Sequence, residues 1–245
     1  VVVFGSDEIW NLNNCLGGII DAYYFGENIK TKKISYATSF GSTSGIDESQ
    51  EYIKNALLEF QYVSLRDKNS SDIMNNIGFK GSAMVLDPTF LLEQANVEPD
   101  IKTKYIFYYC VSKNCKLDEE LTELSKKLGI EIIAFGYKHK KFKNIISIGP
   151  FEWLGYLKNA EYVVTNMFHG TIFSIKYRKK FIVEMTKYRE NKLGFLLEIV
   201  NLRNRIYEKD ELESILLQDV SYDNAFEKIS KMKKISEEYI VRALQ

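Results

Sequence analysis

Short apolar runs alternate regularly with amphipathic stretches along most of the chain. Short β-branched and aromatic runs are typical of buried strands, and the amphipathic stretches between them are typical of helices that cover a sheet. Strands that alternate with helices form βα units, and the strands of such units are parallel. The sequence therefore predicts an α/β protein with doubly wound sheets.

The predicted elements fall into two groups along the chain. In the first half we expect strands at Val1–Phe4, Lys33–Ala37, Gln61–Leu65 and Ala83–Leu86, with helices at Glu48–Phe60 and Asn69–Ile77. In the second half we expect strands at Tyr105–Val111, Glu131–Phe135, Asn144–Ile148, Tyr162–Thr165 and Phe181–Glu184, with helices at Asp118–Leu128, Phe151–Lys158 and Gly170–Tyr177.

The length of the chain favours two domains, because 245 residues exceed the size of a typical single compact domain. The stretch from Leu92 to Lys104 is polar and contains Pro99, as linkers often do. We therefore expect an N-terminal α/β domain at 1–95, a C-terminal α/β domain at 96–220, and a terminal helix at 221–245 whose apolar stripe packs back on earlier structure. Two Rossmann-like doubly wound domains of this kind form a glycosyltransferase-B-like arrangement, with ligands bound in the cleft between the domains.

The start of the chain is abrupt. It opens without a methionine, directly in the apolar run VVVF, which is typical of a strand already under way. We expect that a preceding segment is missing and that the N-terminal domain is incomplete at its start.

Composition excludes several classes of function. The chain has 33 basic and 33 acidic residues, so its overall charge does not favour nucleic acid as a partner. It has no apolar run approaching the roughly 20 residues of a membrane span. Its 3 cysteines show no metal-type spacing, which favours a reducing compartment. We expect a cytoplasmic protein with no transmembrane segment, and leave open a peripheral association with the inner face of the membrane.

Polar residues follow the predicted strands of the first half, where open α/β sheets bind ligands. Ser6 and Asp7 follow the first strand in GSDEIWN, and Ser39 follows the second in SYATSFG. We interpret these three as residues of the cleft that bind the acceptor, with a simple turn or helix cap as the alternative. Arg66, after the third strand, could hold an anion through two parallel hydrogen bonds, or form a surface salt bridge to Asp67 or Asp87.

The stretch VVTNMFHGTIFS places His169 where a strand passes into a helix. We expect the helix to begin at Gly170, which would leave the amides of Thr171 and Ile172 available to an anion, with Asn166 beside them. A histidine next to a bound anion stays protonated and can act as a general acid. The alternative is a buried structural histidine.

The other histidine, His139, lies in YKHKKFK, which we interpret as a solvated basic loop. Because neither histidine has a carboxylate or cysteine at ligand spacing, the sequence implies no metal and no cofactor.

Several of these segments together resemble one known family. GSDEIWN, ISYATSFG, VSLRDKNS, VLDPTFLL, IGPFEWLGYLKNAEYVVTNMFHGTIFSI and RENKLGFLLEIVNLRNRI occur in the order found in polysaccharide pyruvyl transferases. The resemblance extends from Val1 to Arg205. It implies a glycosyltransferase-B-like fold and transfer of the pyruvyl group of phosphoenolpyruvate, as co-substrate, to two hydroxyls of a sugar. That sugar belongs to an exopolysaccharide or other cell-surface polysaccharide, or to its lipid-linked precursor.

The resemblance also assigns roles to single residues. It implies that His169 is catalytic and that Arg66 binds the donor, in the same cleft. The chain departs from the family pattern at Met167, where a second arginine is usual. This departure leaves open a related donor, a different reaction or an inactive relative. Two further hypotheses remain, a glycosyltransferase that uses a nucleotide sugar and a non-catalytic sugar-binding protein of the same pathway.

Overall fold

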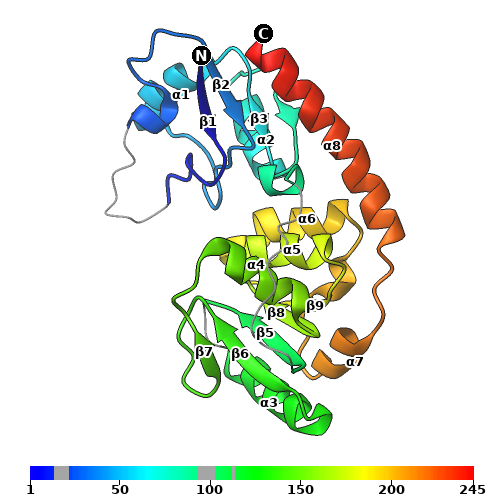
Figure 1. The fold of residues 1–245 in the computed structure, drawn as a ribbon. Helices are drawn as coiled ribbons and strands as arrows, with labels where there is room; N and C mark the ends of the chain where they lie inside the picture. The colour runs from blue at the N-terminus through cyan, green and yellow to red at the C-terminus, as the bar shows by residue number, and fades with distance from the viewer. Residues whose placement is uncertain (14–21, 93–102, 112–113) are drawn as a thin grey trace. The chain divides into compact units, whose positions relative to one another are not determined.

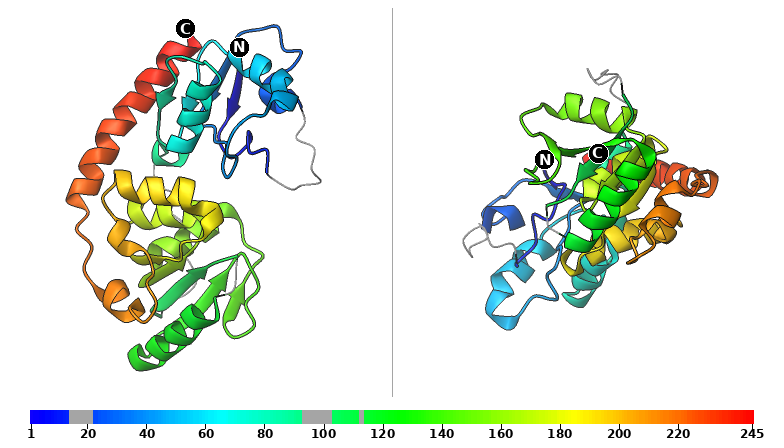
Figure 2. Two further views of the ribbon diagram at one scale, coloured as in Figure 1. Left: turned by 180° about the vertical axis from the view of Figure 1, so that it is seen from behind. Right: turned by 90° about the horizontal axis from the view of Figure 1, so that it is seen from below.

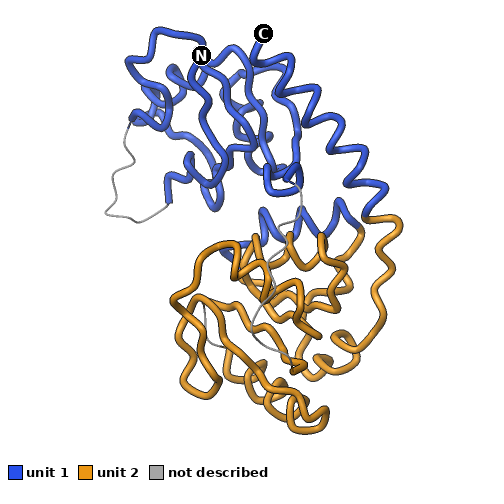
Figure 3. The backbone as a smooth tube through the Cα atoms, viewed as in Figure 1, with its two compact units in different colours: residues 1–92, 187–200, 226–245 blue, residues 93–186, 201–225 orange. Residues whose placement is uncertain are grey.

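The structure is a computed structural model that describes residues 1–13, 22–92, 103–111 and 114–245 (Figure 1). It confirms an α/β fold with parallel sheets. The chain divides into two compact units (Figure 3). Unit 1 consists of Val1–Leu92, Lys187–Val200 and Phe226–Gln245, and unit 2 consists of Glu93–Thr186 and Asn201–Ala225.

The described strands of unit 1 are parallel and follow one another in chain order. Strand β1 (Val2–Gly5) pairs with β2 (Lys33–Tyr36), and β3 (Ser64–Leu65) pairs with β4 (Ala83–Met84). Isolated parallel bridges from Ile34 to Tyr62 and from Thr38 to Leu65 connect the two pairs. The helices α1 (Glu51–Leu58) and α2 (Lys68–Asn76) cover this half. All of these elements lie within a few residues of the predicted positions.

The core of unit 1 is aromatic. The Trp10 ring lies 5.3 Å from that of Phe40 and 5.6 Å from that of Phe60, and all three side chains are buried. The indole nitrogen of Trp10 donates to the carbonyl of Tyr24 at 2.9 Å. Trp10, directly after GSDEI, therefore anchors the segment that follows β1 in the core of unit 1.

The terminal helix α8 (Asp223–Leu244) packs on unit 1 from Phe226 onward. The Tyr239 hydroxyl donates to the carbonyl of Ser35 at 2.6 Å, and the Ser236 hydroxyl accepts from the amide of Leu86 at 2.9 Å. Ala243 is buried in the same apolar cluster as Ile34. The face of α8 that contains Ser236, Tyr239 and Ala243 is thus in contact with unit 1.

The segment Lys187–Val200 differs from expectation, because it belongs to unit 1 and not to the expected domain at 96–220. It contains a π-helical turn at Glu190–Gly194 and helix α6 (Phe195–Ile199), and it buries Leu193, Leu196 and Leu197. Periodicity reveals such an apolar face but not the partner it packs on. The expected linker at 92–104 lies largely outside the described residues.

Unit 2 contains a parallel sheet of five strands among the described residues, in the order β7-β6-β5-β8-β9. These strands are β5 (Tyr105–Tyr109), β6 (Glu131–Phe135), β7 (Lys143–Ile145), β8 (Tyr162–Thr165) and β9 (Lys180–Val183). Figures 1 and 2 show α3 (Cys115–Leu128) and α7 (Leu212–Leu217) on one face of the sheet, and α4 (Pro150–Asn159) and α5 (Phe168–Lys176) on the other.

Local capping explains where α3 begins, three residues before the predicted start. The Asn114 side chain accepts from the amides of Lys116 and Leu117, each at 3.2 Å. Short 3₁₀ segments occur at Ala22–Phe25, Glu48–Gln50, Pro88–Phe90, Lys187–Arg189 and Arg203–Arg205.

Candidate functional site

The strand order of unit 2 reverses direction between β5 and β8. From β5 the chain proceeds outward to β6 and β7, and it then returns to the other side of β5 for β8 and β9. In open α/β sheets, ligands bind at the carboxyl ends of the strands at such a reversal. Tyr109 ends β5 and Thr165 ends β8, and the two residues are register partners. The segment after Thr165 is therefore the place where unit 2 is expected to bind a ligand.

His169 lies in the first turn of α5, directly after this reversal, and its side chain is exposed. Its ring meets the Phe168 ring edge to face, with 5.7 Å between centroids. Because Phe168 is buried, it fixes the first turn of the helix and leaves His169 on the outer side. His169 is therefore not the buried structural histidine that we considered as the alternative, and its imidazole is accessible to a ligand.

Asn166, Gly170 and Thr171 lie beside His169 but are buried. The Asn166 side chain accepts from the amide of Val111 at 3.1 Å and donates to Glu184 at 3.0 Å. These bonds connect the ends of three strands. Asn166 thus has internal partners where we expected a ligand.

Helix α5 begins at Phe168, so the predicted start at Gly170 was wrong. The amide of Thr171 donates to the carbonyl of Met167 at 3.0 Å, and the Thr171 hydroxyl donates to the same carbonyl at 3.1 Å. The amide expected to bind an anion is therefore used by the helix itself. The Met167 amide donates to the Thr165 hydroxyl, a turn that periodicity could not detect.

Gly170 is required by packing. A Cβ atom at this position would lie 2.4 Å from the Thr165 hydroxyl oxygen and 3.1 Å from the Tyr109 ring. We had expected this glycine to admit a ligand. Instead, it lets the first turn of α5 approach the sheet, and this approach sets the position of His169.

In unit 1, Arg66 lies between two carboxylates at the carboxyl ends of the strands. Its guanidinium donates to Asp87 at 2.8 Å and to Asp7 at 2.5 Å. The side chains of Arg66 and Asp87 are buried, whereas 62% of the Asp7 side chain is exposed. The structure thus gives Arg66 internal partners in place of the expected donor. The bond to Asp87 is a buried ion pair and not a surface one.

Asp7 is the accessible member of this trio. Burial by itself would raise the pKa of Asp7, but the charge and hydrogen bond of Arg66, a backbone hydrogen bond and the charge of Lys192 together hold the pKa below its ordinary value. Asp7 is therefore a fixed, ionised hydrogen-bond acceptor at the carboxyl end of β1. Sugar hydroxyls are donors that such a carboxylate can bind.

The other two residues expected to bind the acceptor have different surroundings. Ser6 is half-buried next to Asp7. Ser39 is buried, and its hydroxyl accepts from the amide of Gly41 at 2.9 Å. Ser39 thus forms the turn that we considered as its alternative, and its backbone amide donates to the carbonyl of Asp7.

Sequence reasoning missed a cluster around Glu8. The Glu8 carboxylate accepts from Asn11 and from the Tyr188 hydroxyl, each at 2.8 Å, and forms an ion pair with Lys192. Asn191 donates to the carbonyl of Gly41 at 3.0 Å. The only signal in the sequence was the motif GSDEIWN itself. Tyr188 and Lys192 lie 180 and 184 positions from Glu8, beyond the reach of any local pattern.

The Glu8–Lys192 pair predicts a pH-dependent stability. Burial would raise the pKa of Glu8, but Lys192 and the hydrogen bonds hold it below the model-peptide value of 4.5. The stabilisation is therefore complete above that value and is lost as the pH falls through the lower pKa of the folded state. We expect Lys192→Met to reduce the free energy of unfolding by about 1.5–3 kcal/mol at neutral pH, and by less at about pH 3.

Urea denaturation of wild type and Lys192→Met at both pH values measures this difference. Lys187→Met is the matched control, because Lys187 is an exposed lysine of the same segment. A loss of stability in Lys192→Met that is equal at both pH values would contradict the prediction.

His139 is buried, so its interpretation as part of a solvated surface was wrong. Its Nε2 lies 3.0 Å from Asp118, and its Nδ1 accepts from the amide of Lys141 at 3.3 Å. Asp118 also accepts from the Tyr108 hydroxyl at 3.0 Å. The surrounding lysines hid this role, because a pattern of charges does not show which member of a loop points inward.

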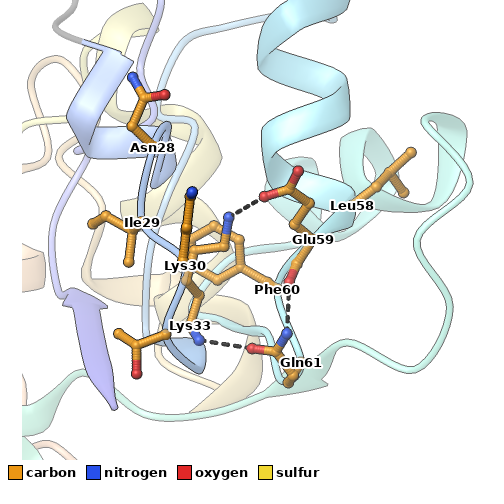
Figure 4. A pocket seen from close by; sticks show the side chains of 9 residues that line it. Asn28, Ile29, Lys30, Lys33, Leu58, Glu59, Phe60 and Gln61 are labelled. Carbon is orange, nitrogen blue, oxygen red and sulfur yellow. Dashed lines mark hydrogen bonds and ion pairs between the residues drawn. The ribbon is translucent and has the colours of Figure 1, made fainter.

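A polar pocket of about 730 Å³ lies at the amino ends of the unit 1 strands, away from all of the predicted residues (Figure 4). In it the buried Lys33 amine is bonded to Glu59 and to the carbonyl of Gly26. The remaining lining residues are Asn28, Ile29, Lys30, Thr31, Leu58, Phe60 and Gln61.

Among the described residues, no three His, Cys, Asp or Glu side chains lie together as metal ligands would. No described helix combines the length and apolar character needed to cross a membrane.

A sequence model of the family "Polysaccharide pyruvyl transferase" matches residues 1–186. No curated protein is significantly similar in sequence. Similar solved structures include UDP-GlcNAc 2-epimerase from Methanocaldococcus jannaschii in complex with UDP-GlcNAc and UDP, at 15% identity over 85% of this chain and 70% of that chain, with a TM-score of 0.48. The S. aureus MnaA–UDP structure is 10% identical over 88% of this chain and 65% of that chain, with a TM-score of 0.48. UDP-GlcNAc 2-epimerase from Neisseria meningitidis is 9% identical over 89% of this chain and 65% of that chain, with a TM-score of 0.45.

Proposed function

The chain belongs to the polysaccharide pyruvyl transferase family, and on that premise we propose that it transfers a pyruvyl group from phosphoenolpyruvate to two hydroxyls of one sugar. The family is one of transferases, which makes the chain an enzyme of that class. The proposed acceptor is a sugar of an exopolysaccharide or other cell-surface polysaccharide, or of its lipid-linked precursor. The proposed location is the cytoplasmic side of the membrane. The family match does not favour a nucleotide-sugar glycosyltransferase or a non-catalytic relative.

The proposed reaction forms a cyclic ketal and releases phosphate. The first sugar hydroxyl adds to C2 of phosphoenolpyruvate while C3 takes up a proton and becomes a methyl group. The second hydroxyl then bonds to C2 as the bond from C2 to the phosphate oxygen breaks. One hydroxyl proton is balanced by the proton gained at C3, and the other leaves with inorganic phosphate.

The observation that carries this proposal is the position of His169. It is exposed, in the first turn of a helix, at the point where the strand order of unit 2 reverses. The amino end of a helix favours bound anions, and an anion keeps a neighbouring imidazole protonated. Such an imidazole can give the proton that C3 needs. We assign His169 the role of general acid.

The remaining roles follow from accessibility. In unit 1 we assign Asp7, with Ser6 beside it, to the hydroxyls of the acceptor, because Asp7 is exposed and held in its ionised form by Arg66. Arg66 then acts on the acceptor side, by positioning Asp7. We further propose that the two units are the two Rossmann-like domains of a glycosyltransferase-B-like arrangement, which their parallel sheets support.

Ligand-dependent thermal unfolding tests the choice of donor. A ligand that binds only the folded state raises the melting temperature, by an amount that grows with its concentration relative to Kd. We expect phosphoenolpyruvate to raise the melting temperature more than inorganic phosphate does, and UDP-N-acetylglucosamine to leave it unchanged. A rise with the nucleotide sugar alone would overturn the proposal in favour of a glycosyltransferase.

A further inference from the structure

One edge of unit 2 is rich in lysine and poor in carboxylates. Residues 136–153 contain four lysines and one carboxylate, that of Glu152. The Glu152 carboxylate accepts from the amide of Gly149 at 2.9 Å, and Lys143 pairs with Glu131. The other three lysines, Lys138, Lys140 and Lys141, are exposed. This segment runs from the end of β6 to the start of α4, and we call it the β6–α4 edge.

The loop of the β6–α4 edge is anchored from inside. The buried His139 ring stacks on the buried Phe142 ring, with 3.9 Å between centroids. The Asn144 side chain accepts from the amide of His139 at 2.6 Å and donates to the carbonyls of His139 and Phe142. Because His139 and Phe142 point inward, the lysines between and beside them point outward as a group.

Apolar side chains are exposed along the same edge. The exposed fractions are 64% for Phe151, 44% for Ile146 and 42% for Tyr137. The amide of Gly136 donates to the carbonyl of Ile145 at 3.2 Å. Tyr137 and Ile146 both follow the carboxyl ends of the neighbouring parallel strands β6 and β7, at the same edge of the sheet.

Ring contacts extend this surface to the start of α4. The Tyr137 ring stacks on that of Tyr109 at 5.8 Å, and the Tyr109 ring meets that of Trp153 at 5.0 Å. Trp153 lies two residues from Phe151 in the first turns of α4. The lysines and the exposed apolar groups therefore lie at the same edge of the sheet, where β6 and β7 end.

We propose that the β6–α4 edge docks on an anionic lipid bilayer. Lysine ammonium groups bind anionic headgroups, and aromatic and aliphatic side chains enter the boundary between headgroups and acyl chains. A nucleic acid would use the lysines and leave Phe151 and Ile146 in water, so the mixed surface favours a bilayer. Tyrosine at the rim fits the same interface, because it has an apolar ring and a polar tip. This proposal does not depend on the proposed reaction.

Co-sedimentation with lipid vesicles tests the proposal. We expect the protein to bind vesicles made of equal parts phosphatidylglycerol and phosphatidylcholine, and not vesicles of phosphatidylcholine alone. The triple variant Lys138→Gln/Lys140→Gln/Lys141→Gln should bind about 100-fold more weakly, at about fivefold per lysine. Phe151→Ser should weaken binding by about tenfold through lost apolar contact.

The matched control replaces three lysines of α8, in Lys228→Gln/Lys231→Gln/Lys234→Gln, and should bind as the wild type does. Melting temperatures verify that each variant is folded, which is expected because the changed side chains of the β6–α4 edge are exposed. Failure of the wild type to bind the anionic vesicles would overturn the proposal. Binding that depends on the lysines but is unchanged in Phe151→Ser, with equal binding to single-stranded DNA, would also overturn it and indicate a polyanion site.

Discussion

Replacing His169 with asparagine is expected to lower the rate of pyruvyl transfer by about 10²–10⁴, the usual worth of a general acid. Asparagine has a similar size and can donate a hydrogen bond, but it cannot give up a proton to C3. Because the His169 side chain is exposed, its replacement should cost little stability. Stability and donor binding should stay close to wild type, so the loss should appear in kcat.

The measurement is transfer of labelled pyruvyl groups from phosphoenolpyruvate to the saccharide fraction of the source cells. The other histidine supplies the control, because His139 is buried and bonded to Asp118. His139→Asn should lower the melting temperature while the folded fraction keeps its activity. Full activity in His169→Asn would end the catalytic assignment.

Arg66→Met is expected to reduce the free energy of unfolding by about 3–5 kcal/mol, because it leaves the buried Asp87 carboxylate without its cation. The family resemblance alone led us to expect a loss of donor affinity instead. The two bonds from the guanidinium to Asp87 and Asp7 change that expectation into one about stability.

Urea denaturation measures the effect. The double variant Arg66→Met/Asp87→Asn should recover part of the loss, because it removes the buried charge as well as its partner. Lys231→Met breaks an exposed pair with Glu227 and should leave the free energy of unfolding close to that of the wild type. If Arg66→Met kept full stability and bound phosphoenolpyruvate more weakly, the guanidinium would be a donor clamp after all.

The strands and helices could be predicted from the sequence because they depend on local periodicity. The ranges Glu131–Phe135 and Tyr162–Thr165 agree with β6 and β8 to the residue. A strand that is buried on both faces appears as a short continuous apolar run, and the amphipathic stretches before and after it mark where it begins and ends. The placement of His169 after β8 followed in the same way, since a strand that passes into a helix has a recognisable spacing.

The start of α5 was missed by two residues because the turn that opens it depends on one hydrogen bond from the Met167 amide to the Thr165 hydroxyl. The same limit applied to Gly170, whose role depends on the distance to Thr165 and Tyr109. Distances of this kind exist only once the strand and the helix are packed together.

The α/β elements, the family and the position of His169 after β8 could be inferred before folding is considered, because each depends on residues that are neighbours along the chain. The partners of the charged residues, by contrast, depend on how distant segments pack together. Arg66 meets Asp7 across 59 positions, and Glu8 meets Lys192 across 184. The same packing buries His139 although lysines surround it. The energy of an ion pair or a buried ring depends on proximity in space and on exclusion of water, and neither quantity is encoded in local periodicity.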